Sequence, residues 1–143
     1  MNTIRKSIYR SFSAILVIML CLSILTPIAS AVPGSHYIHS FSANMTAGNN
    51  GNVTVWFNIV GTDTMDRIGS TRIEILENGR IVHTYFHTST AGMMGSNRVF
   101  HAGNITYQGV IGRQYSAQVT FLAGRDGGSD TRNMRTGTVT ARR

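Results

Sequence analysis

From residue 36 onward, apolar and polar positions alternate with a period of two, and no helical periodicity is present. The clearest run is 53–59, where Val53, Val55, Phe57 and Ile59 occupy every second position. A second run, 115–123, repeats the pattern with tyrosine, alanine, valine and phenylalanine. One apolar and one polar face per segment is typical of strands in a sheet that buries one side.

Stretches rich in glycine, asparagine and aspartate separate these runs, and these residue types tolerate the positive φ angles of turns. Asn78-Gly79 is the strongest hairpin signal. Gly103-Asn104 predicts either a bulge in its strand or a turn that splits it. The expected strands are 36–46, 53–60, 70–77, 80–87, 98–107, 113–123 and 131–141.

Seven short strands without a helix predict an all-β fold, a seven-stranded β-sandwich of immunoglobulin-like type. A small β-barrel is the alternative.

The first 31 residues have the features of a signal peptide. An uncharged apolar core at 14–25 precedes Ala29-Ser30-Ala31, which has the form that signal peptidase cuts, so cleavage is expected after Ala31. An uncleaved membrane anchor is the alternative. The basic residues before the core are Arg5, Lys6 and Arg10. The expected organisation is a signal peptide at 1–31 and one sandwich domain at 32–143, exported and free of the membrane after cleavage.

Removal of the leader leaves a moderately basic chain without cysteine. The only cysteine, Cys21, lies in the leader, so no disulfide staples the exported domain. Ten arginines and six acidic residues remain, which gives a net charge of +4. A charge of this size is ordinary for a soluble domain.

Two segments resemble known modules. "GRQYSAQVTFLAGRDGGSDTRNMRTGTVTA" (112–141) resembles the last two strands of a fibronectin type III-like module, with a tyrosine opening the sixth strand and a Gly/Ser-rich loop after it. "VTVWFNIVGTDTMDRIGSTRIEILENG" (53–79) resembles the second and third strands of small exported proteins of Gram-positive bacteria that carry such domains. The resemblance implies a fold and says little about activity, because such sandwiches host many functions.

The resemblance also implies a role for Tyr115 as a tyrosine-corner residue, whose hydroxyl bonds back to the preceding connection. One position departs from the family pattern. The modules commonly place a tryptophan in the inward phase of the second strand, but here Phe57 holds that phase and Trp56 falls on the opposite face.

Enzymatic signatures are absent. The exported chain has no thiol nucleophile, no G-x-S-x-G elbow and no phosphate- or dinucleotide-binding glycine motif, so we expect neither catalysis nor a cofactor. His83 and His87 would share one face of a helix. On a strand they are about 13 Å apart, too far for one metal ion, and only a cross-strand site stays open.

The segment "AGRDGGSDTR" (123–132) predicts a turn, because its glycines and aspartates are turn formers. In the predicted topology the connections 61–69, 88–97 and 124–130 share one pole, and the shorter connections share the other. This pole suggests either a calcium site or ligand pocket, or a mesh of Asp–Arg pairs, and we expect arginine to be the cation among the carboxylates. Its candidate residues are Asp63, Asp66, Arg67, Met93, Met94, Arg125, Asp126, Asp130 and Arg132.

The sequence therefore predicts a secreted, non-catalytic module that binds a wall polymer, a carbohydrate or another protein, through this pole or an exposed sheet face. No nucleic acid is expected as a partner. The alternative is a cationic polyanion-binding or effector protein that uses a basic strip at its arginine-rich C-terminal strand. Its residues would be Arg132, Arg135, Arg142 and Arg143. Such charges also protect an edge strand from aggregation.

Overall fold

The computed structural model describes residues 35–143. The chain divides into two units, 1–33 and 34–143, so the predicted leader and its cleavage site lie outside the described residues. Within the described part of the chain, no helix is long and apolar enough to cross a membrane.

Strands make up most of residues 35–143, and no helix occurs among them. The long strands are β1 (Ile38–Ala47), β2 (Asn52–Met65), β3 (Arg67–Glu77), β4 (Arg80–Phe86), β6 (Arg98–Gln108), β7 (Gln114–Arg125) and β8 (Gly128–Arg135). Each overlaps one predicted range. The short strand β5 (Met94–Gly95) was not predicted, and the predicted strand 131–141 is divided into β8 and the short β9 (Val139–Thr140).

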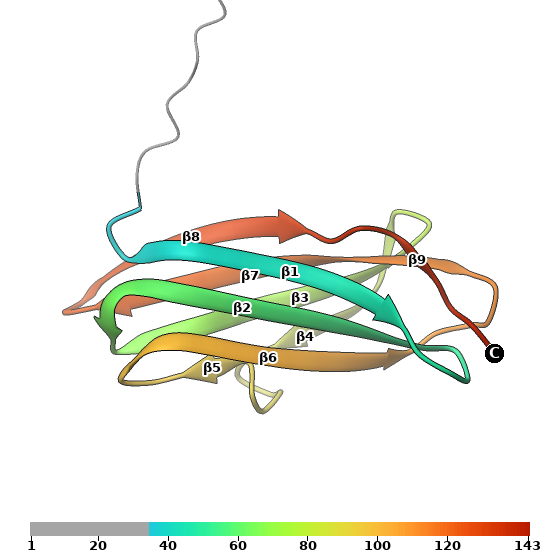
Figure 1. Cartoon of the computed structure of the whole chain (residues 1–143), viewed down its shortest axis with the longest axis horizontal. Helices are drawn as coiled ribbons and strands as arrows, with labels where there is room; N and C mark the ends of the chain where they lie inside the picture. The colour runs from blue at the N-terminus through green and yellow to red at the C-terminus, as the bar shows by residue number, and fades with distance from the viewer. Residues whose placement is uncertain (1–34) are drawn as a thin grey trace, which may run out of the picture. The chain divides into compact units, whose positions relative to one another are not determined.

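The strands form two antiparallel sheets, which confirms the all-β prediction (Figure 1). The small sheet has the order β1-β2-β6. The large sheet has the order β4-β3-β7-β8, with β5 paired to β3 and β9 paired to β7. Hairpins join neighbours within a sheet, and the chain changes sheet between β2 and β3, between β4 and β6, and between β6 and β7. The result is a sandwich-like arrangement of two layers.

The core lies between the layers and follows the predicted alternation. The inward residues of β2, Val53, Val55, Phe57 and Ile59, are at most 3% exposed. Those of β7 are at most 1% exposed, namely Tyr115, Ala117, Val119, Phe121 and Ala123. The hydrophobic effect of burying these side chains is the main contribution that holds the two sheets together.

Two hairpins turn on an Asx-Gly pair. Asn78 and Gly79 have φ angles of 49° and 83°, as the hairpin prediction requires. Asp126 and Gly127 have nearly the same values, 54° and 82°, so the segment quoted above is a turn. This turn is tighter than the predicted connection 124–130, because Arg125 and Gly128 already pair across the hairpin.

The prediction of a loop at 61–69 is wrong, because most of these residues belong to strands. β2 continues to Met65 and β3 begins at Arg67, so one residue separates strands in different sheets. The pairing of β2 with β6 is interrupted between Val60 and Met65, where the strand bends. Gly61 permits the bend, since a Cβ there would lie 2.7 Å from the Met65 Cγ atom and Met65 is turned into the core.

β6 passes through Gly103-Asn104 without a bulge or a turn, unlike either prediction. Phe57 pairs with Gly103 and Trp56 pairs with Asn104 in an unbroken register. The glycine serves packing, because a Cβ at position 103 would lie 2.6 Å from the Phe57 ring.

Candidate functional site

The predicted pole does bring its carboxylates together around an arginine. The Arg125 guanidinium contacts Asp63 at 2.5 Å and Asp126 at 3.1 Å. The Asp126 backbone N–H donates to an Asp66 carboxylate oxygen at 2.9 Å. The arginine therefore lies among the carboxylates, as the sequence predicted. No group of three or more His, Cys, Asp or Glu side chains within residues 35–143 is arranged to hold a metal ion.

The electrostatics of this cluster are those of solvated ion pairs. The pKa of Asp63 is lowered, first by the hydrogen bond from the Thr64 backbone N–H and then by Arg125. The same pairing raises the pKa of Arg125. Both groups are exposed, and exposed pairs contribute little stability. The cluster fastens the β7–β8 hairpin to the corner between β2 and β3.

The remaining candidate residues of the pole have different surroundings. Asp130 accepts hydrogen bonds from the Ser35 hydroxyl at 2.5 Å and the Tyr37 backbone N–H at 3.1 Å, which lower its pKa. Met93 is fully buried in the core, and Met94 is half-buried in β5, so Met93 cannot line a surface pocket. Arg67 is exposed at the start of β3. The turn at Asp126-Gly127 and the corner at Asp66 are too short to enclose a ligand, and the connection 87–93 packs its Met93 into the core.

The arginines of the alternative polyanion site do not form one strip. Arg132 pairs with the inward-facing Phe121, whereas Arg135 pairs with Gln118 on the outer face. Residues an odd number of positions apart on a strand face opposite sides, so these two arginines diverge. Arg135 donates to the Ser116 hydroxyl at 3.3 Å. The Arg142 carbonyl accepts from the Gly51 N–H, which places the C-terminus at the other pole.

The histidines of the described chain occupy separate environments. His83 packs against Tyr85 and Tyr107, with ring centroids 4.4 and 5.8 Å away. His87 Nδ1 lies 3.3 Å from the Thr71 carbonyl oxygen, and the buried His101 lies 2.9 Å from that of Gly92. Each of these three rings is used locally in packing or hydrogen bonding.

Tyr115 has the predicted packing and hydrogen bond. It is 1% exposed, and its hydroxyl accepts from the Val110 backbone N–H at 2.9 Å in the preceding connection. The hydroxyl also donates to Glu77 at 2.8 Å. Burial raises the pKa of Tyr115, while the Tyr115 hydroxyl and then Arg113 lower the pKa of Glu77. This residue ties the start of β7 to the connection before it and to the end of β3, at the pole opposite Arg125, and has a structural role.

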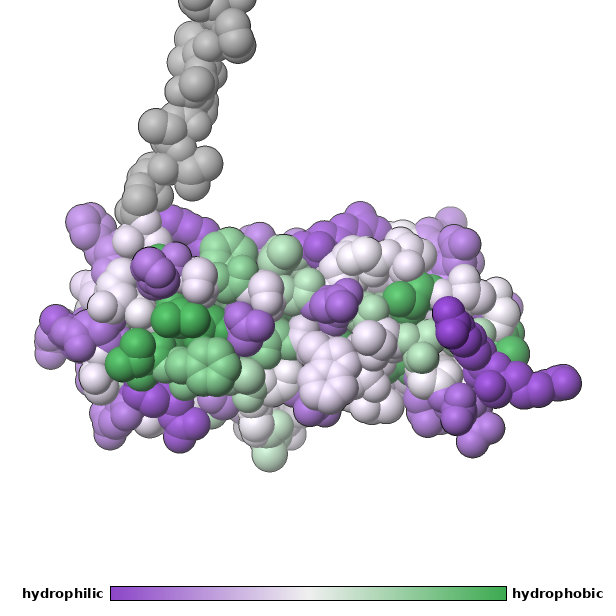
Figure 2. Space-filling model, in the orientation of Figure 1, coloured by the Kyte–Doolittle hydropathy of each residue, from purple (hydrophilic) through white to green (hydrophobic). Residues whose placement is uncertain are grey.

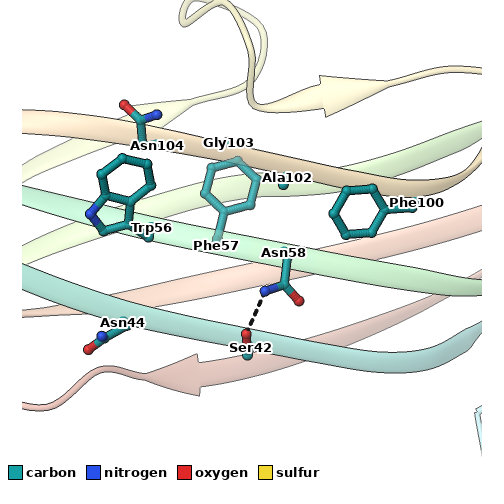
Figure 3. Close-up of a pocket in the computed structure, with 9 residues that line it drawn as sticks. All are labelled: Ser42, Asn44, Trp56, Phe57, Asn58, Phe100, Ala102, Gly103 and Asn104. Carbon is teal, nitrogen blue, oxygen red and sulfur yellow. Dashed lines mark hydrogen bonds between the residues drawn. The ribbon is translucent and has the colours of Figure 1, made fainter.

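A groove of about 360 Å³ lies on the outer face of the small sheet (Figure 3). Trp56 and Phe100 are its large exposed side chains, 49% and 53% accessible. Its remaining lining residues are Ser42, Asn44, Phe57, Asn58, Ala102, Gly103 and Asn104. Figure 2 shows an apolar area over β2 and β6 on this face, beside a paler region with few strongly polar side chains.

The register arranges this face in rows across the three strands. Asn44, Trp56 and Asn104 form one row, so the indole has a carboxamide on either side. Phe100 lies level with Val60, four residues further along β2. We call the outward positions of four rows the neutral face. Its residues are Ser40, Ser42, Asn44, Thr46, Thr54, Trp56, Asn58, Val60, Phe100, Ala102, Asn104 and Thr106.

The neutral face carries no ionisable side chain, although the domain contains ten arginines and six acids. Its aromatic rings are oriented. Trp56 Nε1 donates to the Thr46 hydroxyl at 3.1 Å, which holds the indole against the sheet. Figure 3 shows the Trp56 and Phe100 rings nearly face-on, with their faces turned outward. Asn58 donates from Nδ2 to the Ser42 hydroxyl at 2.8 Å, which fixes a polar pair beside them.

The sequence placed Trp56 on the outer face without assigning it a site, and it did not single out Phe100. The sequence signal for Trp56 was an aromatic residue at an outward position of the clearly alternating run 53–59. Identifying Phe100 required the pairing of β2 with β6. These strands are separated by 32 residues in the chain, and their register depends on the whole sheet.

No family model, curated protein or solved structure matches this chain.

Proposed function

We propose that this protein is an exported, non-catalytic binding module whose neutral face binds an uncharged carbohydrate outside the cell. The observation that carries the proposal is Trp56, a half-exposed indole between Asn44 and Asn104 on a face without charges. Export rests on the leader sequence, with its cleavage motif at Ala29-Ser30-Ala31.

The residue types of the face match the chemistry of a sugar. A sugar ring has an apolar C–H side and a rim of hydroxyl groups. The negative face of an aromatic ring attracts the slightly positive C–H side, and large rings bury much apolar area. Asparagine side chains both donate and accept hydrogen bonds, as sugar hydroxyls do. Asn44 and Asn104 lie in the same row as the indole, beside the position of a ring stacked on Trp56.

The absence of charge favours a neutral ligand over an anionic one. A polyanion binder gathers arginine or lysine on one surface, and the neutral face has none. The face also holds no acid, base or thiol that could perform a reaction on a bound ligand, which supports a binding role without catalysis.

For the fold, we propose a fibronectin type III-like sandwich. Three hairpins, three changes of sheet and the strand orders β1-β2-β6 and β4-β3-β7-β8 support this type. The buried Tyr115 at the start of β7, with its hydrogen bond to the preceding connection, supports it further.

The test is retention of the protein, without its leader, on insoluble neutral glycans such as cellulose, chitin, xylan and granular starch. Trp56→Ala should lower retention at least tenfold, roughly the value of one stacked ring. Phe86→Ala is the matched control, because Phe86 is 48% exposed but lies on β4 of the other sheet. Equal loss in both variants, or retention independent of Trp56, would reject this site.

A further inference from the structure

The groove runs along the strands and presents two aromatic surfaces. Phe100 is level with Val60, so it lies four strand residues from Trp56. At about 3.3 Å per residue, the two rings are roughly 13 Å apart along the sheet. That distance exceeds the span of one sugar ring, so a single ring cannot cover both Trp56 and Phe100.

The space between the rings is low and has a polar wall on one side. Ala102 pairs with Asn58 in the row between them, and its methyl group leaves the surface hollow (Figure 3). Asn58 and Ser42 form the polar wall, joined by their 2.8 Å hydrogen bond. Phe57, beneath Gly103, forms part of the floor. A chain crossing from one aromatic ring to the other would meet hydrogen-bonding groups on one side and no obstruction.

The end of the groove beyond Trp56 is not closed by a large side chain. The next row contains Thr46, Thr54 and Thr106, and the Thr54 and Thr106 hydroxyls lie 3.0 Å apart. These short side chains extend the polar surface without forming a wall. This end of the groove therefore admits a chain that continues past Trp56.

Resting on the proposed function, we infer that the ligand is a linear neutral polysaccharide bound along the strands, with Trp56 and Phe100 as two separate stacking positions, and recognised within the chain instead of at its end. The ring faces, their separation and the hollow at Ala102 are the observations that carry this inference.

The experiment follows Trp56 fluorescence during titration with linear cello-, xylo-, malto- and chito-oligosaccharides of increasing length. Trp56 is the only tryptophan of the chain, so its emission reports directly on the first stacking position. For the series that binds, affinity should rise with length until the oligomer covers both rings and then level off. Attachment of the reducing end to a bulky carrier should leave long-oligomer affinity unchanged.

Phe100→Ala separates one stacking position from two. It should weaken binding of long oligomers about tenfold and leave the disaccharide unchanged, because only long oligomers reach Phe100. Phe100 is half-exposed, so the variant should fold, as circular dichroism can check. Ala102→Trp is the second variant, which should block long oligomers more than short ones.

The outcomes distinguish this inference from the function on which it rests. A Trp56 response with the same length dependence in Phe100→Ala, or loss of binding when the end is blocked, overturns the inference and leaves the proposed function standing. No response to any neutral oligomer in any series overturns both.

Discussion

The outer faces of the two sheets follow the same alternation but carry different chemistry. On the large sheet the outward positions include the Arg72–Glu74 pair, 3.6 Å apart, and Arg135 beside Ser116. On the small sheet the neutral face has rows of serine, threonine and asparagine around Trp56 and Phe100, and no charge. Folding places the same demand on both faces, because neither contributes to the core between the sheets.

The difference lies in which exposed side chains are accompanied by charge. Charged outward positions keep a sheet soluble and resist edge-to-edge association. Half-exposed Trp56 and Phe100 have the opposite tendency, since exposed apolar surface favours association. The large sheet also exposes Phe86, but Arg72 lies directly opposite it, whereas no charge accompanies the rings of the neutral face.

The largest expected effect is on stability and leaves the comparison intact. Tyr115→Ala should cost about 3–5 kcal/mol, because it empties a fully buried site in β7. Tyr115→Phe should cost about 1 kcal/mol through loss of the hydroxyl between Val110 and Glu77. Chemical denaturation measures both. Tyr115→Phe should retain full affinity for the neutral-face ligand, and reduced affinity at full folding would show that the two regions are coupled.

A second prediction concerns the packing under the neutral face. Gly103→Ala should destabilise the protein by about 1–3 kcal/mol, since its methyl group would overlap the Phe57 ring. Ligand affinity should fall as well, because Phe57 and Gly103 line the groove. The control is Gly79→Ala in the β3–β4 turn, which meets no atom within 4 Å but has a φ of 83°. It should cost backbone strain of about 1 kcal/mol and leave affinity unchanged. Equal affinity in both variants would contradict the groove.

Adding one charge to either outer face, in separate variants, tests the comparison itself. Ala102→Arg places a charge in the hollow of the neutral face, and Asn133→Arg places one on the outer face of the large sheet. Both are exposed positions, so each should change stability by less than about 0.5 kcal/mol. Calorimetric titration should show a loss of affinity of at least about tenfold for Ala102→Arg only. The same loss from Asn133→Arg would mean that the neutral face is not the site.

The smallest effect concerns pH. The pKa values of Asp63, Glu77 and Asp130 are lowered in the folded protein. A carboxylate with a depressed folded pKa stabilises the fold above its unfolded pKa of about 4, and this contribution is lost as pH falls through the folded value. The melting temperature should therefore decrease in acid, and less so for Asp130→Asn.

Affinity should stay constant between about pH 5 and pH 9, because the neutral face has no titrating group. A titration in the binding curve would indicate a charged contact.

Local patterns predicted most of the fold. The alternation at 53–59 and 115–123 depends only on neighbouring residues in the sequence, and both strands bury the predicted face. The turn at Asn78-Gly79 likewise depends on two residues. The corner at 61–66 was mistaken for a loop because its glycine, threonines and aspartates are turn formers, whereas the packing of Met65 into the core keeps the chain extended. β5 and β9 consist of two residues each, and only their partners β3 and β7 define them.

The candidate site was harder to predict, since it depends on register between distant strands. Arg125 and Asp63 could be grouped from topology alone, because connections at the same pole of a sandwich lie near one another. Arg132 and Arg135 looked like a strip because they are close in sequence, but their strand sends them to opposite faces. The row Asn44–Trp56–Asn104 exists only once three strands are aligned.

The most direct test of the central claim is Trp56 emission during titration with soluble neutral polysaccharides and, separately, with heparin, each at low and high salt. The account predicts a saturable change in emission with at least one neutral polysaccharide and a midpoint that salt does not move, because no charges take part. Heparin should leave the emission unchanged. If no neutral polysaccharide alters Trp56 emission while heparin binds and is released by salt, the neutral face is not the binding site and the protein is a polyanion binder.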